Sequence, residues 1–106
     1  MTLQSFSDAA DALDNPHYVL RLFVTGMTPR STRAIRAVRD ICESRLEGRF
    51  ELEIVDVYQQ PKMIQGEQVV ATPTLIKYRP APLRRIVGDM SDTYRLCHGL
   101  GLPFES

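Results

Sequence analysis

The sequence has few of the residues on which enzyme active sites and metal sites depend. Its 106 residues include no tryptophan, two histidines and two cysteines. They form no Cys-x-x-Cys pair, phosphate-binding loop, hydrolase triad or cluster with the spacing of metal ligands. His17 and His98 each stand alone and are expected to be surface or packing residues. We therefore expect no catalytic residue, no cofactor and no metal.

An excess of charge of one sign is also missing. Thirteen Lys and Arg balance thirteen Asp and Glu, so no overall field attracts nucleic acid or an anionic membrane. The longest apolar run is far below the ~18 residues that span a bilayer, and no basic stretch followed by an apolar core suggests a secretion signal. The length suits one domain. We expect a cytoplasmic protein without nucleic-acid or membrane partners.

The two cysteines are interpreted as structural. Cys42 falls on the apolar stripe of a predicted helix, where a free cysteine usually acts as a small hydrophobe. Cys97 is followed by His98, but neighbouring helical residues point about 100° apart, so this imidazole is poorly placed to take the thiol proton.

The N-terminal half has strong local signals. Tyr18 to Val24 is nearly continuous in apolar residues and predicts a central strand. Thr28 and Pro29 predict the start of a helix that Gly48 ends. Phe50 to Val57 alternates and predicts a second strand, parallel to the first in a right-handed βαβ unit. The apolar stripe of the helix is Ala34, Ile35, Val38, Ile41, Cys42 and Leu46.

The C-terminal half has weaker signals. Pro61 to Val69 predicts a short helix that Gly66 weakens. Thr74 to Arg79 and Leu83 to Val87 predict two strands, and the short Pro80-Ala81-Pro82 connection favours an antiparallel hairpin.

A last helix is predicted from a cap at Ser91, with Gly99 and Gly101 ending it after about two turns. Five of the seven prolines and four of the six glycines follow residue 60. Composition favours an ordinary loop-rich half. The alternative is a second packing of this half that differs by a few kcal/mol.

The third predicted strand follows a proline in the stretch Ala71-Thr72-Pro73-Thr74-Leu75. This stretch resembles the cis-proline corner of thioredoxin-like domains, which faces a redox Cys-x-x-Cys pair after the first strand. Here Met27 and Arg30 occupy the positions of the two thiols. Because such an enzyme needs a low-pKa thiol at a helix N-terminus, the sequence indicates binding. The alternative is a thioredoxin-like redox protein that has lost its Cys-x-x-Cys pair.

Ordered motifs over residues 18–102 are similar to those of the KaiB family, in the family's order and spacing. They are Leu22-Phe23-Val24-Thr25-Gly26-Met27-Thr28-Pro29 with Ser31, Arg33 and Ala34; Val55-Asp56-Val57 with Pro61; Ala71-Thr72-Pro73-Thr74-Leu75 with Lys77; Pro82 and Arg84-Arg85-Ile86-Val87-Gly88-Asp89 with Ser91; and Gly99-Leu100.

This resemblance implies a non-enzymatic α/β protein that binds the N-terminal ATPase ring of a KaiC-type protein. It implies a resting βαββααβ homo-oligomer (dimer or tetramer) and a thioredoxin-like βαβαββα form, between which the C-terminal half refolds. Pro73, Gly99 and Gly101 are the expected fold-switch residues. The family domain would cover residues 18–102, with an N-terminal extension (1–17) and a short tail (103–106).

The family's further partners are KaiA and a sensor histidine kinase. Glu51 and Glu53 stand on the second strand where cyanobacterial members often carry Ala and Lys, which argues against KaiA as a partner. Gly101 replaces a common Asp and loosens the backbone. These departures suggest a member that serves stress adaptation instead of a true oscillator. A single-fold adaptor for a sensor kinase remains an alternative.

Basic side chains are the candidates for partner contact. Arg30, Arg33, Arg36 and Arg39 recur every third residue on the first helix, which also fits an ordinary solvated face. Arg84 and Arg85 are adjacent on a strand and should point to opposite faces. We expect contact with acidic residues of the ring, which mainly speeds docking. The predicted partner-binding residues are Lys62, Lys77, Arg84, Arg85 and Arg33.

Overall fold

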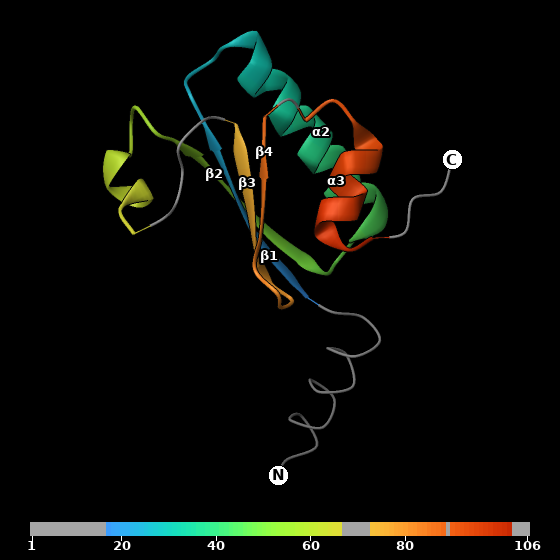
Figure 1. Ribbon diagram of the computed structural model, residues 1–106. Coiled ribbons are helices and arrows are strands. Elements are labelled where there is room, and N and C mark those ends of the chain that lie inside the picture. The colour runs from blue at the N-terminus through green and yellow to red at the C-terminus, as the bar shows by residue number, and fades with distance from the viewer. Residues whose placement is uncertain (1–16, 67–72, 89, 103–106) are drawn as a thin grey trace.

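A computed structural model describes residues 17–66, 73–88 and 90–102 (Figure 1). The order of its elements is that of the predicted thioredoxin-like arrangement, which is confirmed. The elements are β1 (Tyr18–Val24), α2 (Pro29–Arg45), β2 (Phe50–Asp56), a short 3₁₀ helix η1 (Pro61–Ile64), β3 (Thr74–Arg79), β4 (Arg84–Val87) and α3 (Thr93–Leu100).

The four strands form one sheet in the order β2-β1-β3-β4. β1 and β2 are parallel, with Tyr18 opposite Phe50, so they form the predicted βαβ unit with α2. β3 runs antiparallel to β1, and β4 runs antiparallel to β3. The predicted hairpin is therefore confirmed, and the peptide bonds Arg79–Pro80 and Ala81–Pro82 in its turn are cis.

The long helix α2 begins where the sequence predicts. The Thr28 hydroxyl oxygen accepts a hydrogen bond from the Ser31 backbone N–H at 3.1 Å, and Pro29 occupies the first helical turn. Its inner face carries Ala34, Val38 and other small or aliphatic residues that are almost fully buried. This stripe fixes the helix against one face of the sheet.

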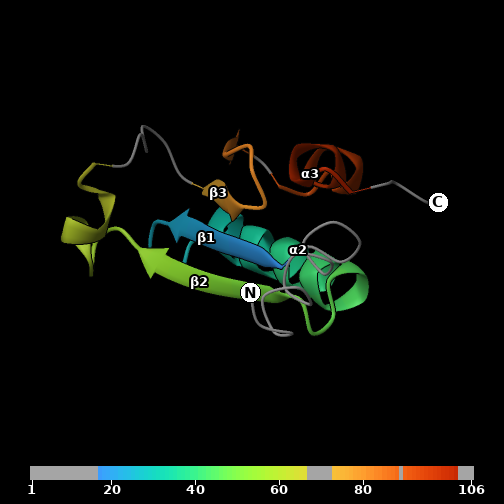
Figure 2. The same cartoon turned by 90° about the horizontal axis from the view of Figure 1, so that it is seen from below.

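The helices α2 and α3 lie on one side of the sheet and η1 lies on the other (Figures 1 and 2). The larger core fills the space under the two helices and includes Leu20, Leu22, Leu75 and Ile86. A smaller core of Phe23, Val55 and Ile76 lies on the opposite face, where Met63 and Ile64 of η1 pack against it. We call these the helix face and the η1 face of the sheet.

Three expectations about the C-terminal half need correction or lie outside the described part. The cap of α3 is Asp92, not Ser91, because the Asp92 carboxylate accepts the Arg95 backbone N–H at 3.2 Å. Gly99 lies inside α3, and only Gly101 ends it. The helix predicted from Pro61 to Val69 is the 3₁₀ helix η1 over Pro61–Ile64. Residues 67–72 lie outside the described ranges, and with them Thr72, which would form the expected cis bond to Pro73.

Within the described ranges, no helix is both long and apolar enough to cross a membrane.

Candidate functional site

The place where thioredoxin-like enzymes carry their thiols is the turn between β1 and α2. Met27 is 90% exposed there, and Arg30 is exposed on the first turn of α2. A thioether and a guanidinium cannot act as the thiolate nucleophile of a redox pair. This turn therefore offers a surface and not a redox centre.

Hydrogen bonds of the Ser31 and Thr28 hydroxyl groups stabilise this turn. The Ser31 hydroxyl oxygen accepts hydrogen bonds from the Thr25 backbone N–H at 3.2 Å and from the Thr28 hydroxyl at 2.9 Å. It donates to the Thr25 carbonyl oxygen at 3.3 Å. Ser31 is buried, so these bonds satisfy a polar group that would otherwise be costly to bury. They fix the loop at the N-terminus of α2.

The three residues expected to govern a fold switch lie in the C-terminal half. Thr74 pairs with Phe23, which places the buried Pro73 at the same end of the sheet as the thiol-position turn. Gly99 faces β4, where a Cβ atom would lie 2.5 Å from the Ile86 Cδ1 atom, closer than side chains approach one another. Gly101 has φ +74° and ends α3 in the left-handed region. Their role in switching stays a prediction.

Both thiols lie in the core under the helices. Cys42 on α2 is fully buried, and burial, followed by the nearby charge of Glu43, raises the pKa of its thiol to about 11. Cys97 on α3 is fully buried as well. A buried thiol whose pKa is raised is a poor nucleophile, which agrees with the structural interpretation of Cys42. For Cys97 the burial of the side chain agrees with the same interpretation.

The two histidines have structural partners that the sequence did not predict. His17 Nε2 lies 3.1 Å from a carboxylate oxygen of Glu51, and the ring of His98 stacks on Tyr94 with 6.2 Å between centroids. No group of three or more His, Cys, Asp or Glu side chains converges in the described ranges.

The five predicted partner-binding residues do not gather into one patch. Arg33 on α2 and Arg84 on β4 belong to the helix side, since Arg84 follows the alternation of the core residue Ile86. Arg85 pairs with Ile76 and points to the η1 face, where η1 carries Lys62. The register of β3 and β4 therefore agrees with the prediction that Arg84 and Arg85 point to opposite faces of the sheet. A partner on one side meets only part of the predicted set, whose role in binding stays a prediction.

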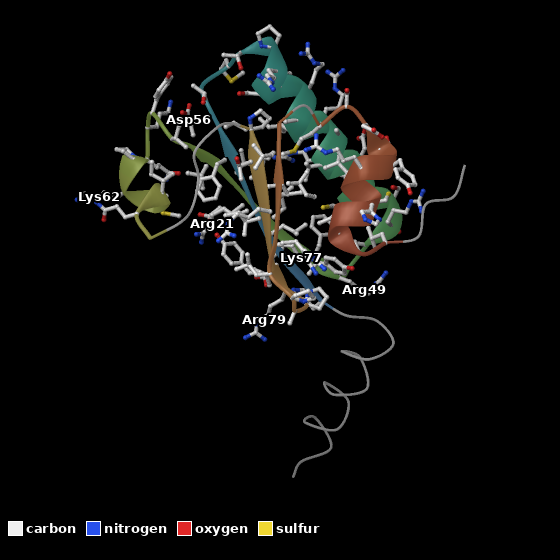
Figure 3. The ribbon with its side chains drawn as sticks, viewed as in Figure 1. Arg21, Arg49, Asp56, Lys62, Lys77 and Arg79 are labelled. Carbon is white, nitrogen blue, oxygen red and sulfur yellow. The ribbon has the colours of Figure 1, made fainter. Side chains whose placement is uncertain are left out.

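Lys77, which is labelled in Figure 3, differs from the other four because only 4% of its surface is exposed. Its ammonium donates a hydrogen bond to the Pro80 carbonyl oxygen at 2.8 Å. Burial, and then the positive charge of Arg84, lower the pKa of Lys77. In this conformation the ammonium stabilises the β3–β4 hairpin through its hydrogen bond to Pro80. Direct contact with a partner would require the ammonium to leave that position.

A groove of about 370 Å³ runs between α2 and the start of α3. Its lining includes three arginines, Arg33, Arg36 and Arg45, against one carboxylate, Asp40. Ser91 and Thr93 line its other side. The spacing of arginines on α2 was visible in the sequence, but the groove depends on how α3 packs beside that helix. An exposed, basic groove suits an acidic protein surface.

The fold and the thiol-position turn together define a thioredoxin-like domain without a redox pair. Solved structures with the same fold include the N-terminal domain of Synechococcus elongatus SasA, with a TM-score of 0.65 and 26% identity over 79% of both chains. Chloroplastic thioredoxin z has a TM-score of 0.66 over 95% of this chain and 88% of its own, but only 14% identity, so it shows the fold alone.

The KaiB domain family model matches residues 21–102. Relatives named circadian clock oscillator protein KaiB include one from Prochlorococcus marinus (strain MIT 9313), 43% identical over 88 residues, or 83% of this chain and 74% of its own. The protein from Synechococcus sp. (strain RCC307) is 44% identical over 88 residues, or 83% of this chain and 80% of its own. The chain belongs to the KaiB family.

Proposed function

We propose that this chain is a non-enzymatic regulator that binds the N-terminal ATPase ring of a KaiC-type protein, in a circadian clock or a clock-derived stress response. One observation carries the proposal: a chain of the KaiB family keeps the thioredoxin-like frame but has an exposed Met27 and an Arg30 at the thiol positions. A frame without its nucleophile is suited to recognition.

The α2–α3 groove is the docking surface that the geometry favours. It presents Arg33 and two further arginines, and Arg84 lies on the same side of the sheet. Exposed positive charges of this kind raise the rate of encounter with an acidic surface more than they raise affinity. The likeness to the N-terminal domain of SasA supports a related recognition role, and the proposal includes a sensor histidine kinase as a further partner.

Refolding of the C-terminal half is part of the proposal. It is supported by the family and by the weak local signals after residue 60, where prolines and glycines concentrate. Backbone NMR over a range of protein concentrations, with and without a KaiC-type ring, tests it. The proposal expects two sets of secondary shifts after residue 60. One unchanging set would leave the single-fold adaptor as the better account.

Co-purification with a KaiC-type ATPase tests the function itself. The proposal expects a complex that depends on the nucleotide state of the ring. A disulfide-reduction assay is the counter-test for the other alternative, a thioredoxin-like redox protein that has lost its Cys-x-x-Cys pair. Failure to bind any ring state would overturn the proposal whatever the NMR result.

A further inference from the structure

The exposed side of α3 carries two stacked aromatic rings. The centroids of the Tyr94 and His98 rings lie 6.2 Å apart, and the ring planes differ by only 8°. Tyr94 is 58% exposed, and His98 is exposed one helical turn further on. Different side chains fix α3 to the core, namely the buried Leu96, Cys97 and Leu100. The Tyr94–His98 pair is therefore an exposed aromatic surface that the packing of α3 does not use.

This pair lies beside the α2–α3 groove. The helices α2 and α3 lie side by side on the same face of the sheet (Figures 1 and 2). Thr93, which lines the groove, directly precedes Tyr94. On another side of α3, Gly99 faces Ile86 of β4, and at about 100° per residue Tyr94 points about 140° away from Gly99. Tyr94 therefore lies at the rim of the groove, on a side of α3 that is turned away from β4.

The groove itself combines apolar walls with an excess of positive charge. Ala37 and Ile41 are among its lining residues. Its charged lining consists of three arginines and one carboxylate, an excess of two positive charges: Arg33, Arg36, Arg45 and Asp40. The charges of α3 do not change this balance, because Asp92 and Arg95 cancel. An acidic surface is therefore the electrostatic complement of this groove.

Charge and aromatic surface contribute differently to binding. Exposed charges mainly raise the rate of encounter, whereas the binding energy of protein interfaces concentrates in a few aromatic and arginine side chains that become buried. The stack on His98 already orders the Tyr94 ring, so little side-chain freedom remains to be lost on binding. Nucleic acid is a poorer match, since the charges of the whole chain cancel. The groove and its rim thus offer steering charge and an ordered aromatic anchor to an acidic protein surface.

We propose that Tyr94, positioned by His98, is the anchor of the helix-side docking surface. Its ring packs on an apolar side chain of an acidic partner surface, whose carboxylates meet the arginines of the groove. This inference rests on the proposed function, because the KaiC-type ring is that partner. Two sets of residues then have separate effects: the arginines raise the association rate, and Tyr94 lowers the dissociation rate.

Dissociation from an immobilised KaiC-type ring tests the anchor. Tyr94→Ala should dissociate about tenfold faster than the wild type, at low and at high salt. The matched control is Tyr58→Ala, because Tyr58 is 76% exposed on the connection between β2 and η1 and should not alter dissociation. A shift between two folds of the free chain changes the observed association rate, so the dissociation rate reports on the contact itself. Equal dissociation of Tyr94→Ala and the wild type would overturn the inference and leave the proposed function standing.

Two substitutions at His98 test its positioning role. His98→Ala removes the stacked ring and should raise the dissociation rate, whereas His98→Phe keeps a ring beside Tyr94 and should restore the wild-type rate. Because both side chains are exposed, the free energy of unfolding should change no more than for an ordinary surface substitution. Equal dissociation of His98→Ala and the wild type would contradict positioning by His98. A wild type that binds no ring state would overturn the proposed function and this inference with it.

Size-exclusion chromatography with light scattering tests whether a second copy of the chain occupies this surface instead. Without the ring, the wild type and Tyr94→Ala should have the same mass at each protein concentration. A smaller mass for Tyr94→Ala would mean that the Tyr94–His98 pair lies between two copies, which would overturn the inference.

Discussion

The phenol hydroxyl of Tyr18 donates a hydrogen bond of 2.9 Å to the carbonyl oxygen of Leu100. This contact joins the first strand to the last helix across almost the whole described chain, and both residues are nearly fully buried. It ties the half with strong local signals to the half that is proposed to refold. Burial raises the pKa of the Tyr18 phenol, partly opposed by the charge of Arg49, which is consistent with a hydroxyl that works as a neutral donor.

Removing this hydroxyl should weaken the thioredoxin-like form. Tyr18→Phe keeps the ring but leaves the buried Leu100 carbonyl without its donor, so we expect the free energy of unfolding to fall by about 1 kcal/mol. Urea denaturation followed by circular dichroism measures it. The matched control is Tyr58→Phe, since Tyr58 is 76% exposed. Equal effects of the two substitutions would contradict a structural role for the Tyr18–Leu100 bond.

The buried ammonium of Lys77 should make stability depend on pH. Its pKa is lowered in the folded state, so the unfolded chain binds more protons between the folded pKa and the unfolded value near 10.5. Stability should therefore rise with pH across this window, by at most about 1.4 kcal/mol per pH unit. Lys77→Met should lack this rise, which appears as a pH-dependent difference from the wild type in unfolding free energy.

Lys62→Met is the control for that experiment, because Lys62 is exposed on η1. It removes one surface ammonium and leaves the β3–β4 hairpin unchanged. A pH-independent difference between Lys77→Met and the wild type would show that the Lys77 ammonium is solvated in the folded protein, contrary to its position beside the Pro80 carbonyl.

The thiols should be unreactive in the folded protein. The pKa of Cys42 is raised to about 11 and both sulfur atoms are buried, so at pH 8 very little thiolate is present or accessible. We expect a thiol reagent such as DTNB to label neither cysteine within minutes, and both at once in denaturant. Rapid labelling of one thiol in the folded protein would support the redox alternative. It would also contradict the packing of the helix that carries that thiol, α2 for Cys42 or α3 for Cys97.

Much of the fold was predictable because local signals agree with tertiary packing. Thr28 and Pro29 fix the start of α2, and the nearly continuous apolar run from Tyr18 to Val24 specifies the central strand β1. Only the second half of this strand is buried on both faces. The cap of α3 was misplaced by one residue, since Ser91 and Asp92 are both good caps. Sequence cannot decide which of two neighbouring oxygens reaches the backbone N–H of Arg95.

The candidate site was harder to predict because it depends on contacts distant in sequence. Lys77 reads as an exposed charge, yet the β3–β4 turn brings the Pro80 carbonyl to its ammonium. Arg33 looked like one member of a regular row, and only the packing of α3 places it in a groove. The spacing of basic residues was visible, whereas the face on which each one lies required the strand register.

Binding of charge-reversed variants to a KaiC-type ring tests the central claim most directly. Arg33→Glu and Arg84→Glu change the helix side, and Lys62→Glu makes the same change of charge on the η1 side. Affinities are measured at low and high salt with each nucleotide state of the ring. We predict that the two helix-side variants bind more weakly and with a reduced salt dependence, while Lys62→Glu behaves like the wild type. No binding by the wild type, or equal binding by all four proteins, would contradict the account.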